Sequence, residues 1–164
     1  MSAPAAASTR GKIVSTPQAI TWRKSLAEPV VFTNGVFDLL HPGHVDYLEA
    51  ARRLGGYLLV AVNTDRSARA LGKGATRPIL DQTARARVLA GLAAVDRVVL
   101  FDEPTPLELI RAVAPDVLVK GGDYTRDSIV GAAEVEARGG RVVVIPLTQG
   151  YSTTALVERC RAAS

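Results

Sequence analysis

The chain has 164 residues, of which 48% are hydrophobic and 5% are aromatic, a composition that favours one folded α/β domain and excludes a disordered segment. The formal net charge of +4 is scattered, with no basic run or nucleic-acid-reading motif, so no nucleic-acid partner is expected. A mildly basic balance also suits a site for phosphorylated small molecules.

The first twelve residues, MSAPAAASTRGK, are small, polar and rich in Pro and Ala, and we expect a flexible tail at 1–12 ahead of one domain at 13–164. They lack the basic and apolar regions of a signal peptide. No apolar stretch of the chain approaches the roughly 20 residues that span a bilayer. We therefore expect a cytoplasmic protein without a membrane partner.

Five short, β-branched apolar runs follow Pro29, and their nearly continuous hydrophobicity is typical of strands buried on both faces of a parallel sheet. They are PVVFTN, YLLVAVN, DRVVLF, PDVLVK and RVVVIP. Helical patterns separate them, with Thr16 as the expected cap of the first helix and Asp81 as the cap of the third. These patterns cover residues 16–27, 43–54, 81–94, 105–113 and about 127–138, and a final STTALVERCRA. The alternation predicts a single doubly wound, five-stranded parallel sheet with right-handed crossovers.

Ligands of such sheets bind beyond the carboxyl ends of the strands. Four segments at these ends are rich in Gly, Lys, Asp, His and hydroxyl side chains, and this convergence predicts a site. The four are TNGVFDLLHPGH, the segment from Asn63-Thr64-Asp65 to ALGKGATRP, KGGDYT, and LTQGYSTT.

His41 and His44 flank Pro42 and Gly43 at the expected start of a helix. Free amides and the helix dipole attract anions there, and Gly43 would let a phosphate approach the backbone. A zinc site is disfavoured, because the chain has only these two histidines and one cysteine and lacks the usual third ligand. Turn histidines satisfied by the backbone remain the alternative interpretation.

Three further groups have both a structural and a functional interpretation. Lys73 lies between glycines in a polar loop, where it is either a solvated lysine or a group that closes over a ligand. Ser152, Thr153 and Thr154 form an expected N-cap, which is also compatible with phosphate. The segment from Lys120 to Asp123 is a turn whose backbone could contact a base or ribose.

Several catalytic classes are disfavoured by what the chain lacks. GxSxG, GxxxxGK[ST] and, after the first strand, GxGxxG are all absent, which weakens hydrolase, P-loop and dinucleotide interpretations. Cys160, the single cysteine, excludes an internal disulfide and fits a reducing compartment, and we expect it to be a packed or incidental thiol.

GVFDLLHPGH at 35–44 resembles the GxFDxxHxGH signature of the HxGH nucleotidyltransferases, and GYSTT at 150–154 resembles their second signature. The resemblance covers residues 29–162 and implies a Rossmann-like nucleotidyltransferase fold. Within this superfamily the chain most resembles the D-glycero-β-D-manno-heptose 1-phosphate adenylyltransferases, here in a stand-alone form without the sugar kinase half. The similar stretches are FTNGVFDLLHPGHVDYLEAAR, VAVNTD, the G–RPI loop, AAVDRVV and PDVLVKGGDY.

Glycerol 3-phosphate cytidylyltransferases are the nearest alternative. Their second motif reads RTxGISTT, whereas this chain has Leu147 in place of the arginine and Tyr151 in place of the isoleucine. Both departures count against CTP and a polyol phosphate. A non-catalytic nucleotide-binding module is the alternative of another class.

The resemblance implies transfer of AMP from ATP to D-glycero-β-D-manno-heptose 1-phosphate. The products are ADP-heptose and pyrophosphate, and the ADP-heptose serves synthesis of the lipopolysaccharide core or other surface heptose. Mg²⁺ is expected on the ATP phosphates, without a protein metal site, and a homo-oligomer is expected. The implied catalytic residues are His41, His44 and Lys73. The implied nucleotide-binding residues are Thr33, Asn34, Gly35, Val36, Phe37, Gly43, Lys120, Gly121, Asp123, Tyr124, Tyr151, Ser152, Thr153 and Thr154. The residues implied to face the acceptor are Asp38, Asn63, Asp65, Arg77 and Arg85.

Overall fold

The computed structural model describes residues 8–72, 76–122 and 124–162. In this part of the chain, no helix is both long enough and apolar enough to cross a membrane. The elements in chain order are η1 Thr9–Lys12, β1 Ile13–Val14, α1 Thr16–Lys24, β2 Val30–Gly35, α2 Pro42–Arg52, β3 Tyr57–Asn63, α3 Asp65–Ala70, α4 Gln82–Gly91, β4 Arg97–Phe101, α5 Leu107–Val113, β5 Val117–Gly121, η2 Arg126–Ser128, α6 Ala132–Glu136, β6 Arg141–Ile145 and α7 Thr153–Ala162.

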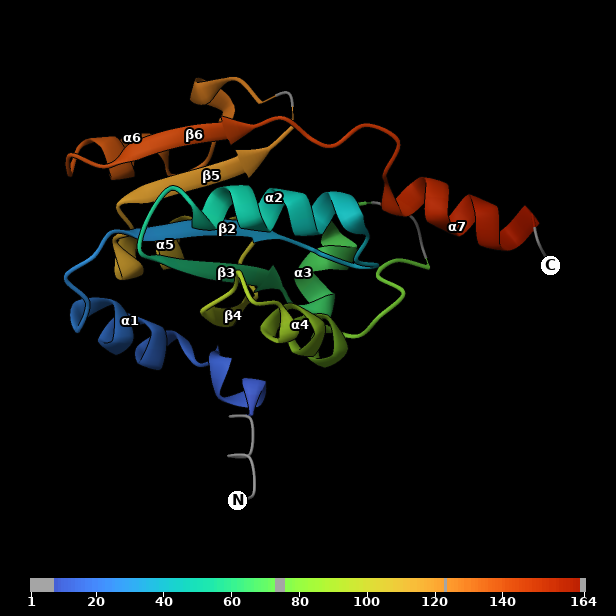
Figure 1. Cartoon of the computed structure of the whole chain (residues 1–164), viewed down its shortest axis with the longest axis horizontal. Helices are drawn as coiled ribbons and strands as arrows, with labels where there is room; N and C mark the ends of the chain where they lie inside the picture. Colours follow the sequence, from blue (N-terminus) through green and yellow to red (C-terminus); the bar gives the residue numbers. More distant parts are fainter. Residues whose placement is uncertain (1–7, 73–75, 123, 163–164) are drawn as a thin grey trace, which may run out of the picture.

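Within the described residues, six strands form one sheet in the order β1-β4-β3-β2-β5-β6, and every neighbouring pair is parallel. From β2 the chain moves outward on one side to β3 and β4, and then crosses back to place β5 on the other side of β2. The strand order therefore reverses between β2 and β5, which is where a doubly wound sheet opens a crevice. In Figure 1 the strand arrows point toward the side of the molecule on which α7 lies.

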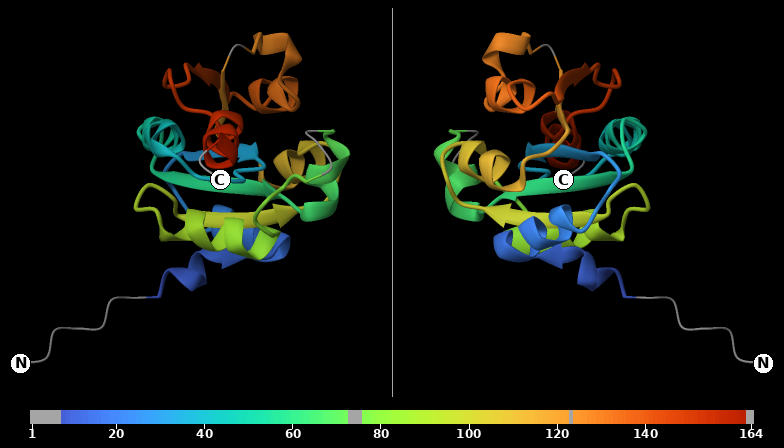
Figure 2. Two further views of the ribbon diagram at one scale, coloured as in Figure 1. Left: turned by 90° about the vertical axis from the view of Figure 1, so that its right-hand side faces the viewer. Right: turned by 90° about the vertical axis from the view of Figure 1, so that its left-hand side faces the viewer.

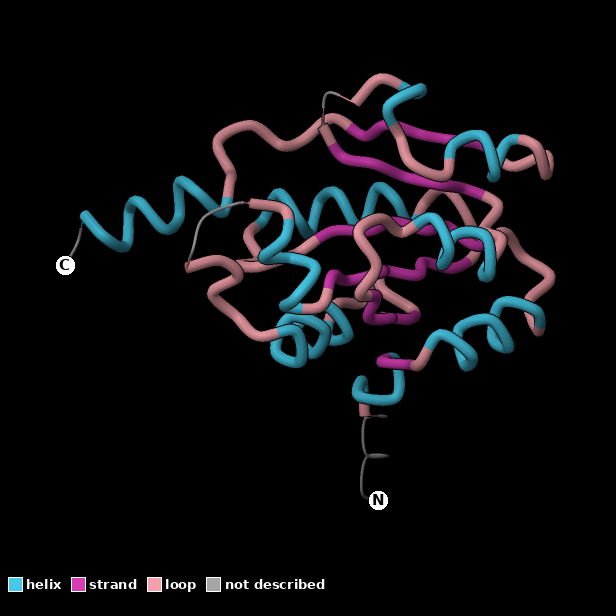
Figure 3. Tube along the Cα trace, turned by 180° about the vertical axis from the view of Figure 1, so that it is seen from behind, coloured by secondary structure: helices cyan, strands magenta, loops and turns pink. Residues whose placement is uncertain are grey.

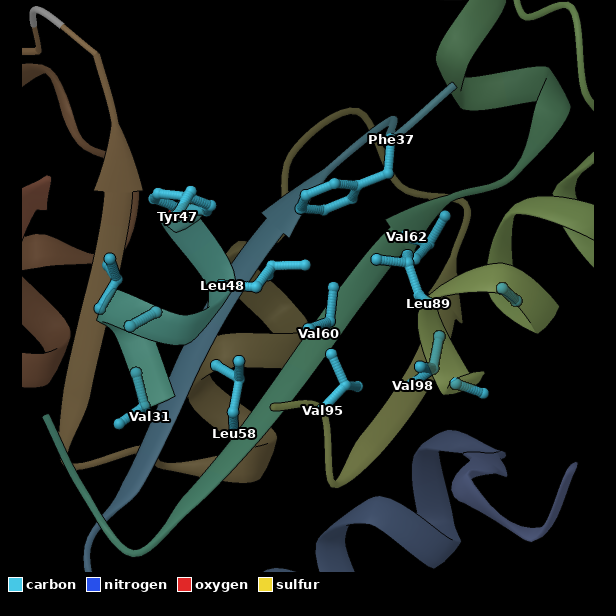
Figure 4. Packing of buried hydrophobic residues seen from close by; sticks show 14 of the residues in the cluster. Val31, Phe37, Tyr47, Leu48, Leu58, Val60, Val62, Leu89, Val95 and Val98 are labelled. Carbon is cyan, nitrogen blue, oxygen red and sulfur yellow. The ribbon is translucent and has the colours of Figure 1, made fainter. Parts of the chain in front are cut away.

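Helices cover both faces of this sheet, as the end-on views of Figure 2 show. Helices α2 and α4 pack on one face, where Leu48 and Leu89 join Leu58, Val60 and other strand residues in one buried cluster (Figure 4). Helices α1, α5 and α6 pack on the opposite face, in a second buried cluster. Burial on both faces explains why β2 to β5 are almost continuously apolar.

The amino end of the sheet is fixed by an ion pair that lies away from the crevice. Arg23 Nη2 donates to both oxygens of Asp116, at 2.9 and 2.8 Å, and Asp116 also accepts from the backbone N–H of Val30 at 2.7 Å. The pair ties α1 to the starts of β2 and β5. Because this pair lies far from the crevice, it can serve as a control for the ion pairs at the carboxyl ends of the strands.

The structure corrects the expected elements in four places. The sheet has six strands rather than five, because β1 is an edge strand of two residues, too short to give an apolar run. Helix α3 was not expected, since DRSARA lacks an apolar repeat. The helix expected at about 127–138 is divided into η2 and α6 by Gly131, whose φ is 88°. Ser15 rather than Thr16 caps α1, in a capping box with Gln18.

The expected tail at 1–12 is only partly within the described residues. Residues 9–12 form η1, and the Lys12 ammonium donates to the carbonyls of Leu92 and Val95 at 3.0 and 2.6 Å. These bonds attach η1 to the end of α4. Residues 1–7 lie outside the described part of the chain.

Candidate active site

A cavity of about 320 Å³ lies at the carboxyl ends of β2 and β5, where the strand order reverses. The β2–α2 turn, the end of β5 and the segment that leads into α7 form its walls. Most of the predicted site residues line it. They are Asn34, Gly35, Val36, Phe37, Asp38, His41, Gly43, His44, Arg77, Lys120, Gly121, Tyr124, Tyr151, Ser152 and Thr153.

The first turn of α2 faces this cavity. His41 is its N-cap residue but makes no side-chain cap hydrogen bond, and Pro42 occupies the first helical position. The rings of His41 and His44 stack with their centroids 3.9 Å apart. Both Nδ1 atoms are buried and have no hydrogen-bond partner among the described residues. Two buried ring nitrogens at an uncapped helix start are suited to an anionic ligand.

The start of α7 meets the start of α2 at Gly43. A Cβ atom on Gly43 would lie 3.2 Å from the Cβ of Tyr151 and 3.2 Å from His41 Nδ1, so the glycine permits this close approach. Ser152 caps α7, because its Oγ accepts from the Ala155 N–H at 3.0 Å. Since Ser152 and Thr153 also line the cavity, two helix N-termini converge on one space.

Burial determines the charge of the two histidines. Desolvation, followed by repulsion from His41, lowers the pKa of His44 to about 4, and desolvation also lowers the pKa of His41. Both imidazoles are therefore neutral at neutral pH in the unliganded chain. An adjacent anion favours the protonated form, so the pair can take up positive charge as negative charge approaches.

The other end of the cavity is apolar and flat. A Cβ atom on Gly121 would lie 2.8 Å from Leu147 Cδ2 and 3.0 Å from the Tyr47 ring, so both side chains pack directly against the backbone of this glycine. Leu147, Tyr124 and Tyr151 around it are 57%, 50% and 43% exposed, which is unusual for large apolar side chains. Such a surface suits the face of a nucleobase.

Tyr47 forms the inner wall at this end of the cavity. Its hydroxyl shares a buried hydrogen bond of 2.6 Å with Thr33 Oγ1, and burial raises the pKa of Tyr47 to about 12. Thr33 itself is completely buried, so it supports Tyr47 from below rather than lining the cavity.

Asp38 holds the loop that precedes α4. Its Oδ1 accepts from the backbone N–H groups of Ile79 and Leu80 at 2.8 and 3.0 Å. Its Oδ2 lies 2.7 Å from Arg77 Nε, an ion pair without the alignment of a hydrogen bond. Both carboxylate oxygens are therefore engaged within the chain, while Asp38 also lines the cavity, and its contact with an acceptor stays a prediction.

Arg85 is the most enclosed charge of the site. Its side chain is 0% exposed, and its guanidinium donates to the carbonyls of Leu80, Val36 and Asn63 and to Asp65 Oδ1, at 2.6 to 3.0 Å. These four acceptors belong to the β2–α2 turn, the end of β3, the start of α3 and the loop before α4. Arg85 lines neither this cavity nor a second cavity on the other side of the β2 end. The sequence had suggested that Arg85 contacts the acceptor; from its burial we infer instead that it positions the site.

The side chain of Lys120 is also held by a hydrogen bond within the chain. Its ammonium donates to Asn34 Oδ1 at 2.6 Å and lies 5.9 Å from the centre of the Tyr124 ring. It therefore stands at the junction of β2 and β5, on the edge of the cavity.

The remaining predicted residues lie elsewhere. Lys73 and Asp123 lie outside the described residues, Thr154 is exposed beside the cavity, and Asn63 lines a neighbouring cavity. The predicted site residues do not include five of the lining residues, which are Tyr47, Ala68, Pro78, Leu147 and Thr148. Only Tyr47 carried a signal, because it follows His44 by three positions and so lies on the same face of α2.

No group of three or more His, Cys, Asp or Glu side chains able to hold a metal ion occurs among the described residues. Asp38, the carboxylate of the cavity wall, already has both oxygens engaged. That Mg²⁺ is held mainly by the phosphates of ATP stays a prediction.

The sequence pattern of the cytidylyltransferase-like family matches residues 32–159. The chain belongs to this family. The cavity that we describe is thereby the candidate active site of a nucleotidyltransferase.

Curated relatives support this assignment. The bifunctional protein HldE of Koribacter versatilis (strain Ellin345) is 58% identical over 138 residues, which cover 84% of this chain and 28% of that protein. HldE of Gluconobacter oxydans (strain 621H) is 54% identical over 157 residues, which cover 93% of this chain and 32% of that protein. The chain thus spans about a third or less of these relatives.

Solved structures share the fold. The lipopolysaccharide core biosynthesis protein from Thermoplasma volcanium GSS1 is 31% identical, with a TM-score of 0.61, and the match covers 77% of this chain and 100% of that one. A pantoate-beta-alanine ligase from Francisella tularensis has a TM-score of 0.64 at 17% identity, covering 84% of this chain and 67% of that one, and supports the fold alone.

The lowered pKa of His44 predicts a pH-dependent stability. As the pH falls from 6.5 to about 4, the unfolded chain binds a proton at this residue before the folded chain does, so the folded state loses stability across that window. The melting temperature of a His44→Asn variant should fall less than that of the wild type between pH 7 and pH 4, measured by calorimetry. Parallel profiles would contradict the burial of a neutral imidazole.

Arg85→Lys tests the positioning role. A lysine ammonium cannot reach four acceptors in the planar arrangement of a guanidinium, and the resulting displacement of the site should lower kcat/KM for nucleotidyl transfer by about 100-fold. The matched control is Arg23→Lys, which weakens an ion pair at the far end of the sheet. It should lower the melting temperature and leave kcat/KM unchanged. Equal losses of activity in both variants would reduce Arg85 to a general stabilising role.

Proposed function

We propose that the chain transfers AMP from ATP to D-glycero-β-D-manno-heptose 1-phosphate, giving ADP-heptose and pyrophosphate for lipopolysaccharide core or other surface heptose synthesis. The observation that carries this proposal is the convergence of the α2 and α7 N-termini, with His41 and His44, on one cavity that has an exposed apolar rim. The names of the HldE relatives and of the lipopolysaccharide core biosynthesis protein support the choice of a heptose acceptor.

The reaction needs neither a nucleophilic side chain nor a strong base. The attacking oxygen belongs to the sugar phosphate, whose second pKa of about 6 leaves it largely ionised at neutral pH. It forms a bond to the α-phosphorus of ATP, and the bond from that phosphorus to the bridging oxygen of pyrophosphate breaks. The chain contributes alignment of the two substrates and neutralisation of the charge that moves onto pyrophosphate.

The cavity residues divide these tasks. His41, His44 and the first-turn amides of α2 stabilise the negative charge that develops as pyrophosphate leaves. The start of α7, with Ser152 and Thr153, holds the terminal phosphates. Lys73, which lies outside the described residues, is proposed as a further contact of the phosphates, and Mg²⁺ bound with ATP would supply further charge neutralisation.

The exposed apolar rim, formed by Leu147, Tyr124 and Tyr151, favours the base of ATP over that of CTP. We place the base beside Gly121, against the exposed faces of Leu147 and Tyr151. Leu147 stands where cytidylyltransferases of the glycerol 3-phosphate type have an arginine, so this chain offers apolar area rather than a charged donor at that position. A purine covers more of the exposed apolar rim than a pyrimidine does.

The direct test is pyrophosphate release with ATP or CTP, each paired with heptose 1-phosphate, a hexose 1-phosphate and glycerol 3-phosphate. We expect efficient release with ATP and heptose 1-phosphate, and a loss of about 100- to 1000-fold in kcat for His44→Ala, since one charge-stabilising donor is removed. The variant should keep its circular dichroism spectrum.

Three outcomes would contradict the proposal. Near-normal turnover by His44→Ala would refute the role of the histidines. Preference for CTP and glycerol 3-phosphate would assign the chain to the other substrate class. Binding of ATP without pyrophosphate release from any pair would favour a nucleotide-binding module.

A further inference from the structure

A second cavity, of about 270 Å³, opens on the other side of the β2 end. It shares Asn34, Gly35, Val36, Lys120 and Tyr124 with the first cavity, so the two spaces meet at the carboxyl ends of β2 and β5. The first cavity extends toward α2 and α7. The second extends toward the ends of β3 and β4, the segment before α5 and the segment after η2.

The two cavities differ in charge. Lys120 is the only charged side chain among the described residues that line the second cavity, and it lies at the shared edge, where its ammonium donates a hydrogen bond to Asn34 Oδ1 at 2.6 Å. Away from that edge, the polar side chains of the wall are uncharged. They are the amide of Asn63 and the hydroxyls of Thr105 and Ser128, set among prolines and aliphatic side chains.

Those carboxylates and arginines that the sequence suggested for the acceptor are already paired with one another. Asp38 is held by Arg77 and by two backbone amides, and Asp65 is held by Arg85. An acceptor that displaced either pair would have to break contacts that are buried or half-buried. The second cavity requires no such rearrangement.

We infer that the second cavity is the acceptor site, and that it binds the uncharged, hydroxyl-rich body of a sugar phosphate. The phosphate of that sugar lies at the shared edge beside Lys120, where it can meet the α-phosphate of a nucleotide in the first cavity. The hydroxyls of the sugar contact Thr105 and Ser128. This inference rests on the proposed function, because it needs a sugar phosphate as the second substrate.

The position of Thr105 and Ser128 makes them specificity residues. Both lie away from the shared edge, on the segments before α5 and at the end of η2. A three-carbon polyol phosphate anchored at Lys120 fills less of the cavity than a seven-carbon sugar does. We therefore expect the two hydroxyls to favour the larger acceptor.

The test measures binding of heptose 1-phosphate in the presence of a non-hydrolysable ATP analogue, by titration calorimetry. Thr105→Val removes one hydroxyl without changing the shape of the side chain and should raise the Kd for heptose 1-phosphate about fivefold. The affinity for the ATP analogue should stay unchanged. Ser128→Ala should act in the same direction, although the Ser128 hydroxyl also donates to the Thr125 carbonyl at 2.7 Å.

Thr125→Val is the matched control. Thr125 is an exposed threonine of the same segment, but it lines neither cavity, so this variant should bind heptose 1-phosphate as the wild type does.

Two results would overturn the inference: no binding of heptose 1-phosphate to the wild type, or equal binding by wild type and Thr105→Val. Binding that is sensitive to Thr105→Val, but without pyrophosphate release, would support the acceptor site and refute the proposed function alone.

Discussion

The enclosed guanidinium of Arg85 is the constraint on which the rest of the site depends. A buried cation is costly unless acceptors surround it, and here the acceptors are supplied by four segments that would otherwise be separate loops. One of these acceptors, the carbonyl of Val36, belongs to the wall between the two cavities. The position of that wall is therefore coupled to α3, to the end of β3 and to the loop before α4. Asp38 adds a second link to the same loop.

On this frame, the chain brings together two helix starts that are more than a hundred residues apart. The glycine at position 43 lets His41 and Tyr151 approach the first turn of α2, so the start of α7 reaches the same space. Neutral, desolvated histidines complete the arrangement, because they can take up positive charge when a phosphate arrives. The chemistry of nucleotidyl transfer, which needs positioning and charge stabilisation more than proton transfer, is suited to such a site.

Much of this arrangement could be predicted from the sequence. The strands β2 to β6 were predicted because burial on both faces leaves long apolar runs, and Asp81 and Ser152 were predicted as caps because such residues bond to the first-turn amides. The location of the site followed from the polar segments at the strand ends. The edge strand β1 and the helix α3 were missed because neither is long enough to show a hydrophobic period.

The roles of the charged residues were harder to predict than their location. Arg77, Arg85 and Asp38 are polar residues near strand ends, and sequence alone does not reveal whether such a group faces a ligand or another part of the chain. Tyr47 was missed because, in the sequence, an aromatic residue on the buried face of a helix resembles any other core residue. Only the structure shows that Asp38 pairs with Arg77 and that Asp65 pairs with Arg85.

The most direct measurement is a crystal structure of the chain with Mg²⁺ and a non-hydrolysable ATP analogue. The account predicts that the triphosphate lies between the first turns of α2 and α7, in contact with His41 and His44, and that adenine lies beside Gly121 and Leu147. A nucleotide bound with its base in the second cavity, or with its phosphates away from α2, would contradict it.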